Sequence, residues 1–238
     1  MRWIVGLQPV REAIRARGKD LGRVLVERSD SPQLEAVVRY ATDQGAQVER
    51  VARAELEKIS GGARHQGVAA QAEELAIVSI EDLALDETSV IVVLDEIQDT
   101  QNFGAIVRSA VAFGATAIMW PEHGSAPLTS ATFRASAGAV EHATLCRVSA
   151  LPAAMSMLKE KGLTVFGLDP QATEPIDKVD LTKGVALVIG AEGKGLRKSV
   201  KSACDFLVRL PMTNRLGSLN ASVSAAIGLY ETARQRRL

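Results

Sequence analysis

Residues 90–108 read VIVVLDEIQDTQNFGAIVR, and this stretch decides the fold class. The run of consecutive apolar residues at 90–94 predicts a strand that is buried on both faces. A polar loop follows, and residues 103–113 then show the apolar spacing of a helix. A buried strand that passes through a polar loop into a helix is the repeating unit of a parallel α/β sheet.

The same alternation continues to the end of the chain. Short apolar runs predict further strands at 117–120, 143–148, 164–168, 185–189 and 206–210. Helical patterns predict helices at 129–140, 151–161, 196–203 and 220–236. In the last helix we expect a buried face made of Val223, Ala226, Ile227 and Tyr230, which follow the i, i+3, i+4, i+7 spacing. Residues 90–238 are therefore expected to form an α/β domain with a mostly parallel sheet.

Residues 1–72 are predicted to form a separate, small α/β domain. Helices are expected from Pro9, from Ser31-Pro32 and at 54–59, with strands at 23–27, 47–51 and 67–72. A core of this size is marginal on its own. The acidic residues 73–89 are expected to form a linker with a short helical piece.

The composition excludes several classes of protein. The 238 residues are 47% hydrophobic, which is too apolar for a disordered chain. The 2 cysteines, Cys146 and Cys204, form no CxxC pair, which excludes a disulfide framework and a cysteine-rich zinc site and favours a cytoplasmic setting. The 3 histidines show no metal-binding spacing, so we expect no metal. The apolar runs are too short to cross a bilayer, and we expect neither a signal peptide nor membrane association.

The charge is balanced overall but unevenly distributed. Residues 1–72 carry 12 basic and 9 acidic side chains, residues 73–193 carry 7 and 17, and residues 194–238 carry 9 and 2. The two basic ends can bind a polyanion if they lie on one face, and they can equally be solvated helix surfaces. The charge pattern leaves both readings open.

Three loops at the carboxyl ends of predicted strands have unusual composition, and ligands bind at such ends in open α/β sheets. In the first loop, Asn102 is placed to cap the next helix, and Arg108 with the helix N-terminus can form an anion site. The second loop, 190–195, reads GAEGKG; its glycines permit close backbone approach, and Glu192 suits a hydroxyl donor or a cation. The third loop leads to the last helix, with Ser218 or Asn220 as the cap. Each loop alone is also compatible with an ordinary turn or capped helix.

Together, these residues resemble a known family. The segments NFGAIVR at 102–108, GAEGKG at 190–195, and LPM at 210–212 with SLNASV at 218–223 resemble the three motifs of the SpoU/TrmH family in the SPOUT superfamily. Members of this family are S-adenosylmethionine-dependent RNA 2′-O-ribose methyltransferases. The segment HQGV at 65–68 resembles the end of the L30e-like RNA-binding domain in the RlmB-type branch, which acts on guanosine in large-subunit ribosomal RNA.

The resemblance implies a fold and a set of site residues. Residues 1–72 would form an L30e-like domain, 73–89 a linker, and 90–238 a SPOUT domain with a deep trefoil knot near 185–223, in a homodimer. The remaining implications concern single residues. Cofactor binding is expected from Gly190, Leu210 and Leu219. Action on the substrate is expected from the catalytic set Asn102, Arg108, Glu192 and Asn220. RNA contacts are expected from Arg11, Arg15, Arg64, His65 and Gln66, with Arg17 and Lys19 as further candidates.

The implied function is S-adenosylmethionine-dependent 2′-O-methylation of a guanosine ribose in 23S rRNA, in the cytoplasm. One alternative is an enzyme of the same family that acts on tRNA. A second is a non-catalytic RNA-binding or ribosome-assembly factor, against which the complete catalytic set argues. A third is a nucleotide-binding α/β protein that does not bind RNA.

Overall fold

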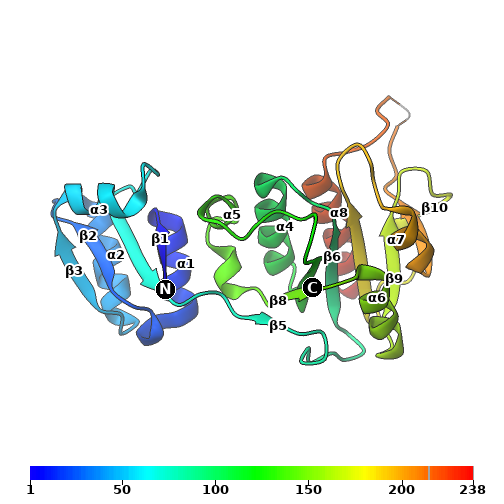
Figure 1. Cartoon of the computed structure of the whole chain (residues 1–238), viewed down its shortest axis with the longest axis horizontal. Helices are drawn as coiled ribbons and strands as arrows, with labels where there is room; N and C mark the ends of the chain where they lie inside the picture. The colour runs from blue at the N-terminus through cyan, green and yellow to red at the C-terminus, as the bar shows by residue number, and fades with distance from the viewer. Residues whose placement is uncertain (214, 238) are drawn as a thin grey trace. The chain divides into compact units, whose positions relative to one another are not determined.

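The computed structural model describes residues 1–213 and 215–237 (Figure 1). It divides into two compact units, of which the first comprises Met1–Leu75 and Leu128–His142. The second comprises Ala76–Pro127 and the described residues from Ala143 onward. Within the described ranges, no helix has the length and apolar character needed to cross a membrane. The same residues contain no group of three or more His, Cys, Asp or Glu side chains able to hold a metal ion.

The first unit is built on a four-stranded mixed sheet with the order β1-β4-β2-β3. Strand β4 runs antiparallel to β1 and β2, and β2 runs parallel to β3. The strands are β1 (Arg2–Val5), β2 (Val24–Glu27), β3 (Val48–Val51) and β4 (Val68–Ala72). The helices are α1 (Leu7–Arg17), η1 (Gly18–Asp20), α2 (Pro32–Asp43) and α3 (Arg53–Ser60). Strand β1 was not predicted, because this short edge strand leads directly into α1 and leaves little pattern of its own.

The helix predicted at 129–140 is broken in the structure. It consists of α5 (Ser130–Ala135) and the 3₁₀ turn η2 (Ala139–His142), separated by Ala137 and Gly138 with φ of 52° and 88°. A right-handed helix cannot continue through these angles. A Cβ on Gly138 would lie 2.7 Å from the Cα of Pro9, so only glycine fits where this segment meets α1.

A buried ion cluster fixes the same segment within the first unit. The Glu141 side chain is 1% exposed and accepts hydrogen bonds from Arg2 Nη2 at 2.7 Å and Arg17 Nε at 2.9 Å. The Arg2 guanidinium also lies 4.9 Å from the centre of the Phe133 ring. Residues 128–142 therefore pack with the N-terminal residues, although in sequence they lie between strands β7 and β8 of the second unit.

The second unit is built on an eight-stranded sheet with the order β10-β12-β9-β11-β6-β7-β8-β5. Each pairing found among the described residues of this sheet is parallel. The strands are β5 (Ile77–Val78), β6 (Val90–Asp95), β7 (Ala117–Pro121), β8 (Leu145–Val148), β9 (Thr164–Leu168), β10 (Glu174–Pro175), β11 (Val185–Gly190) and β12 (Phe206–Arg209). The predicted α/β class, with a small N-terminal unit and a mostly parallel C-terminal sheet, is confirmed.

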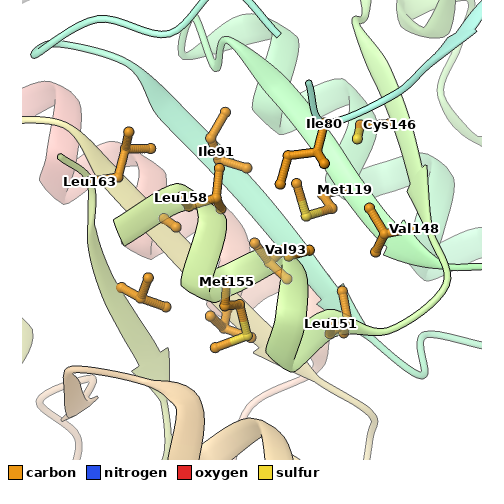
Figure 2. Packing of buried hydrophobic residues seen from close by; sticks show 14 of the residues in the cluster. Ile80, Ile91, Val93, Met119, Cys146, Val148, Leu151, Met155, Leu158 and Leu163 are labelled. Carbon is orange, nitrogen blue, oxygen red and sulfur yellow. The ribbon is translucent and has the colours of Figure 1, made fainter. Parts of the chain in front are cut away.

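Helices cover both faces of this sheet. Helices α6 (Leu151–Glu160) and α7 (Lys198–Ala203) pack on one face. Figure 2 shows the α6 side chains against the buried strand residues of that face, including Leu151, Met155 and Leu158 opposite Ile91, Val93 and Met119. On the other face lie α4 (Thr100–Ala112), α8 (Ala221–Arg236) and the 3₁₀ turn η3 (Ile176–Lys178).

Two sequence predictions for this unit are wrong. The segment 73–89 contains no helix; instead β5 pairs with β8, and Ile80 and Leu83 enter the core. Helix α8 does not bury its predicted face, because Val223, Ile227 and Tyr230 are 45%, 38% and 56% exposed.

The buried face of α8 is made instead mainly of small residues. Its members include Ala221, Ala225, Gly228 and Leu229. A Cβ on Gly228 would lie 3.5 Å from Leu168 and 3.6 Å from Leu187, which shows how closely the helix lies on the sheet. Small residues permit this approach, and apolar spacing alone could not show which of the two helix faces makes it.

Candidate active site

Three loops converge at one edge of the eight-stranded sheet. Strands β6 and β11 are neighbours in parallel, with Asp95 opposite Gly190 at their carboxyl ends. The loop after β6 leads into α4, the loop after β11 carries the glycine-rich segment, and the loop after β12 leads into α8. Neighbouring parallel strands bring their carboxyl ends to the same edge, so residues distant in the chain meet there.

Asn220 holds the first and second loops together. As the N-cap of α8, its Oδ1 accepts hydrogen bonds from the backbone N–H groups of Ser222 at 2.8 Å and Val223 at 3.3 Å. The cap fixes the carboxamide so that Nδ2 points away from the helix. This nitrogen donates to Asn102 Oδ1 at 2.9 Å and to Glu192 Oε1. Three of the four predicted catalytic residues thus form one hydrogen-bonded network.

The role predicted for Asn102 as a helix cap is wrong. Asp99 caps α4, because its Oδ1 accepts a hydrogen bond from Gln101 N at 3.0 Å. Asn102 lies inside the first turn and is buried, with 7% of its surface exposed. Its side-chain oxygen is therefore available to Asn220 rather than to the backbone of its own helix.

A cavity of about 440 Å³ opens beside this network. Its lining includes all three residues predicted to bind a cofactor, Gly190, Leu210 and Leu219. A Cβ on Gly190 would lie 2.3 Å from the backbone carbon of Gly195, so the glycine loop returns directly against the end of β11. Only glycine allows the loop to form this wall of the cavity.

A second cavity, of about 220 Å³, adjoins the first beside the network. It is lined by Asn102, by Gln98 and Asp99 of the first loop, and by residues of the glycine loop. The two cavities share Ala191, Glu192, Lys194 and Ala221 in their linings. Glu192 of the hydrogen-bonded network therefore lines two adjoining spaces, and each space can hold one reactant.

Asp169 and Lys201, which the sequence reading missed, form an ion pair at the larger cavity. Burial raises the pKa of Asp169, but hydrogen bonds from Lys201 and from the backbone N–H of Gln171 together outweigh it and hold this pKa below its ordinary value. A signal was present, because Asp169 directly follows the apolar run of β9, at the same strand end as the recognised loops.

Arg108 lies apart from the other predicted catalytic residues. It is exposed on α4, lines neither cavity, and makes no hydrogen bond or ion pair with another residue in the described part of the chain. The structure of one chain therefore brings together Asn102, Glu192 and Asn220, and leaves Arg108 outside the group.

The residues predicted to contact RNA in the first unit differ in their surroundings. Arg11, Arg15 and Arg64 are exposed. His65 is 6% exposed, and its Nδ1 accepts a hydrogen bond from Gly67 N at 3.0 Å. Gln66, at φ 54°, accepts a hydrogen bond from Leu7 N at 3.2 Å through its side chain. His65 and Gln66 thus shape the turn before β4, and the three arginines are available to a ligand.

Comparisons with known proteins agree with this geometry. Residues 89–230 match the SpoU rRNA Methylase family, and residues 3–78 match the RNA 2′-O ribose methyltransferase substrate binding family. The chain is 34% identical to the 23S rRNA (guanosine-2′-O-)-methyltransferase RlmB of Xanthomonas campestris, over 99% of this chain and 97% of the relative.

Solved structures show the same fold. The SpoU methyltransferase AviRb from Streptomyces viridochromogenes, in complex with the cofactor AdoMet, superimposes with a TM-score of 0.81 and 25% identity, covering 99% of this chain and 90% of that one. The TrmH/SpoU tRNA modifying enzyme of A. aeolicus superimposes with a TM-score of 0.57 and 27% identity, covering 66% of this chain and 80% of that one.

Proposed function

Since the chain belongs to the SpoU rRNA methylase family of RNA methyltransferases, we propose that it transfers a methyl group from S-adenosylmethionine to a ribose 2′-hydroxyl of 23S rRNA, with a guanosine as the target. The observation that carries this proposal is the network of Asn102, Glu192 and Asn220, in which Glu192 lines both of two adjoining cavities. Two reactants that occupy neighbouring cavities can meet at the network in a fixed orientation.

The larger cavity suits S-adenosylmethionine. Leu210 and Leu219 offer apolar walls to an adenine ring, and the backbone at Gly190 permits close approach. Lys201 and Asp169 offer charged groups to the carboxylate and amino group of the methionine part. When bound there, the cofactor supplies a methyl group on a positively charged sulfur.

The chain's own residues orient the hydroxyl that receives the methyl group. A ribose in the smaller cavity lies beside Glu192, and Asn220 is hydrogen-bonded to Glu192, so that these two side chains can hold the hydroxyl groups of the ribose. Asn102 fixes Asn220 in this position. A guanidinium does not readily give up its proton in a protein, so Arg108 serves as a charge partner for the phosphate or for the developing oxyanion, not as a base.

We propose that the working protein is a homodimer. Val223, Ile227 and Tyr230 form an exposed apolar stripe on α8, and Tyr230 also contacts Phe113 at the end of α4. Because α4 carries Arg108 and packs against α8, a dimer formed through this stripe brings Arg108 to the interface, where the second copy's site is in reach. The trefoil knot expected at 185–223 is part of the same proposal.

Substitution of the stripe tests the dimer. Tyr230→Glu combined with Ile227→Asp should give a monomer in light scattering coupled to gel filtration, because charges would be buried in an apolar interface. Ile77→Glu is the matched control, since Ile77 is 40% exposed on β5, outside the stripe. If the double variant stays dimeric, the interface lies elsewhere.

RNA capture is assigned to residues 1–72, through Arg11, Arg15 and Arg64. The domain boundaries at 72 and 90 remain part of the proposal. Ribosomal RNA is favoured over tRNA because the RlmB relative matches 99% of this chain, whereas the tRNA modifying enzyme matches 66%. The site of action would be the cytoplasm.

Incubation with labelled S-adenosylmethionine and total RNA tests the function. Label in 23S rRNA is the expected result; label in tRNA would support the alternative substrate, and no label would support a non-catalytic RNA-binding factor. Arg108→Ala should abolish transfer while leaving cofactor affinity nearly unchanged, because Arg108 does not line the cofactor cavity. Near-normal turnover of this variant would remove Arg108 from the mechanism.

A further inference from the structure

We propose that Arg197, held by the buried carboxylate of Asp95, is a positioning residue that sets the distance between the two loops of the catalytic network. The inference rests on the proposed function, which assigns the glycine loop to cofactor binding and its Glu192 to the substrate.

Asp95 is fully buried at the end of β6, and Arg197 occupies both of its oxygens. The backbone N–H of Arg197 donates to Oδ2 at 2.8 Å, and its Nε donates to Oδ1 at 2.7 Å. A buried carboxylate needs such partners, because an unpaired charge in the interior is costly. Asp95 thus binds one particular residue through two separate groups, which fixes both the position of the chain at 197 and the direction of its side chain.

The pair joins the two loops at the points where they leave the sheet. Asp95 lies opposite Gly190 in the pairing of β6 with β11, and Arg197 follows the glycine loop that begins at Gly190. That loop closes on itself through a hydrogen bond from Gly195 N to Ala191 O at 2.8 Å. The loop is therefore held at its start by the strand and at its end by Asp95.

Glu96 extends this clamp to the other loop. It follows Asp95 with φ at 56°, a conformation that costs energy for a residue other than glycine. Its carboxylate lies 3.5 Å from Arg197 Nη1, and the residue lines the smaller cavity. Arg197 therefore stabilises the strained turn that leads toward Asn102, while its own backbone anchors the loop that carries Glu192.

Arg197 acts on the catalytic network by positioning the two loops, not by contacting a reactant. Asn102 and Glu192 meet at Asn220. Asn102 lies in the first turn of α4, directly after the loop that follows β6, and Glu192 lies in the glycine loop; the Asp95–Arg197 pair holds both loops. Helix α7, which begins directly after Arg197, also carries Lys201 into the cofactor cavity. Loss of the guanidinium should let the glycine loop move relative to β6, which weakens cofactor binding and misaligns the network.

The test compares Arg197→Met with Arg197→Lys and with the control Lys198→Met. Lys198 is the next residue, is exposed and makes no ion pair with the described chain, so its loss changes the net charge equally. Calorimetric titration should show about a tenfold loss of S-adenosylmethionine affinity in Arg197→Met, the lower range for a hydrogen bond between charged groups. Arg197→Lys should recover part of this loss, and Lys198→Met should match the wild type.

A second measurement does not depend on the cofactor. In the free protein, hydrogen exchange at the Gly195 amide should be faster in Arg197→Met than in the wild type, with unchanged exchange in the β6 strand. For RNA, kcat should fall and KM should stay within threefold, since RNA capture is assigned to the first unit. A purely structural role would instead lower the melting temperature and the active fraction, with unchanged affinity in the remainder.

The outcomes separate the two proposals. If the wild type does not bind S-adenosylmethionine, the proposed function fails, and the exchange rates still decide whether the clamp exists. If the wild type binds and Arg197→Met shows unchanged affinity, kcat and exchange at Gly195, the positioning role of Arg197 is overturned and the proposed function stands.

Discussion

The replacement Gly190→Ala tests the assignment of the cofactor cavity through a single methyl group. In the structure, the added Cβ would lie 2.3 Å from the backbone carbon of Gly195 and 2.5 Å from the backbone nitrogen of Leu196. Ordinary contacts begin near 3.4 Å, so the returning backbone must move by about 1 Å. No flexible side chain can absorb this shift, because both neighbouring atoms belong to the main chain.

The shift should affect binding more than folding. Overpacking of this kind costs about 1–3 kcal/mol of stability, and a displacement of about 1 Å at a reacting centre can reduce the rate about a hundredfold. We therefore expect at least a tenfold loss of S-adenosylmethionine affinity by calorimetry and about a hundredfold lower methyl transfer to RNA. Circular dichroism should still show the folded protein.

The control is the same substitution elsewhere in the same unit. Gly228→Ala on α8 meets only ordinary contacts at 3.5–3.7 Å and should stabilise the helix by about 0.5–1 kcal/mol. Its cofactor affinity should equal that of the wild type. If Gly190→Ala binds S-adenosylmethionine within threefold of the wild type, the glycine loop is not the cofactor wall.

Three further predictions concern charge and burial. Glu141→Gln should lower the free energy of unfolding, measured in urea, by about 3 kcal/mol, because it leaves two arginines facing a neutral side chain. The control Glu49→Gln removes an exposed ion pair and should cost less than about 1 kcal/mol. Equal losses in the two variants would contradict the argument from burial. Burial raises the pKa of the Cys146 thiol to about 11 and that of the Cys204 thiol to about 12. Ellman's reagent at pH 8 should therefore label these thiols far more slowly in the folded protein than in the protein unfolded in guanidinium. Equal labelling rates would refute the burial of the two thiols. Because the pKa of Asp169 is lower in the folded than in the unfolded protein, its charged form stabilises the protein above about pH 4, and this contribution disappears as the pH falls through the folded pKa. The difference in stability between the wild type and Asp169→Asn should therefore shrink on acidification. A difference that stays constant with pH would count against the ion pair.

The sequence predicted the parts of the fold that depend on local patterns. The uninterrupted apolar runs at β6 and β11 identified buried parallel strands, because only strands covered on both faces tolerate such runs. Features that depend on tertiary context were missed. The two residues of β5 carry no periodicity, and α8 has one apolar face of small residues and another of large ones, so spacing could not show which face is buried.

For the candidate site, too, the features that depend on local sequence were predicted and those that depend on tertiary context were not. Asn102, Glu192 and Asn220 were identified because they lie in segments at strand ends that resemble the SpoU/TrmH motifs, and the structure joins them by hydrogen bonds. The cap of α4 was assigned to the wrong residue, since Asp99 and Asn102 are both good caps and differ only in where the helix begins. The separation of Arg108 from the network could not be seen in the sequence, because it depends on how α4 is rotated against the sheet.

The most direct measurement is the chemical identity of the methylated nucleoside. The purified protein, 23S rRNA and S-adenosylmethionine should yield 2′-O-methylguanosine after complete digestion, identified by mass spectrometry with the added mass on the ribose. The same reaction with Asn220→Ala should yield none, because that side chain joins Asn102, which lines the smaller cavity, to Glu192, which lines both cavities. A methyl group found on a base, or an undiminished yield from Asn220→Ala, would contradict the assignment of this network to ribose methylation.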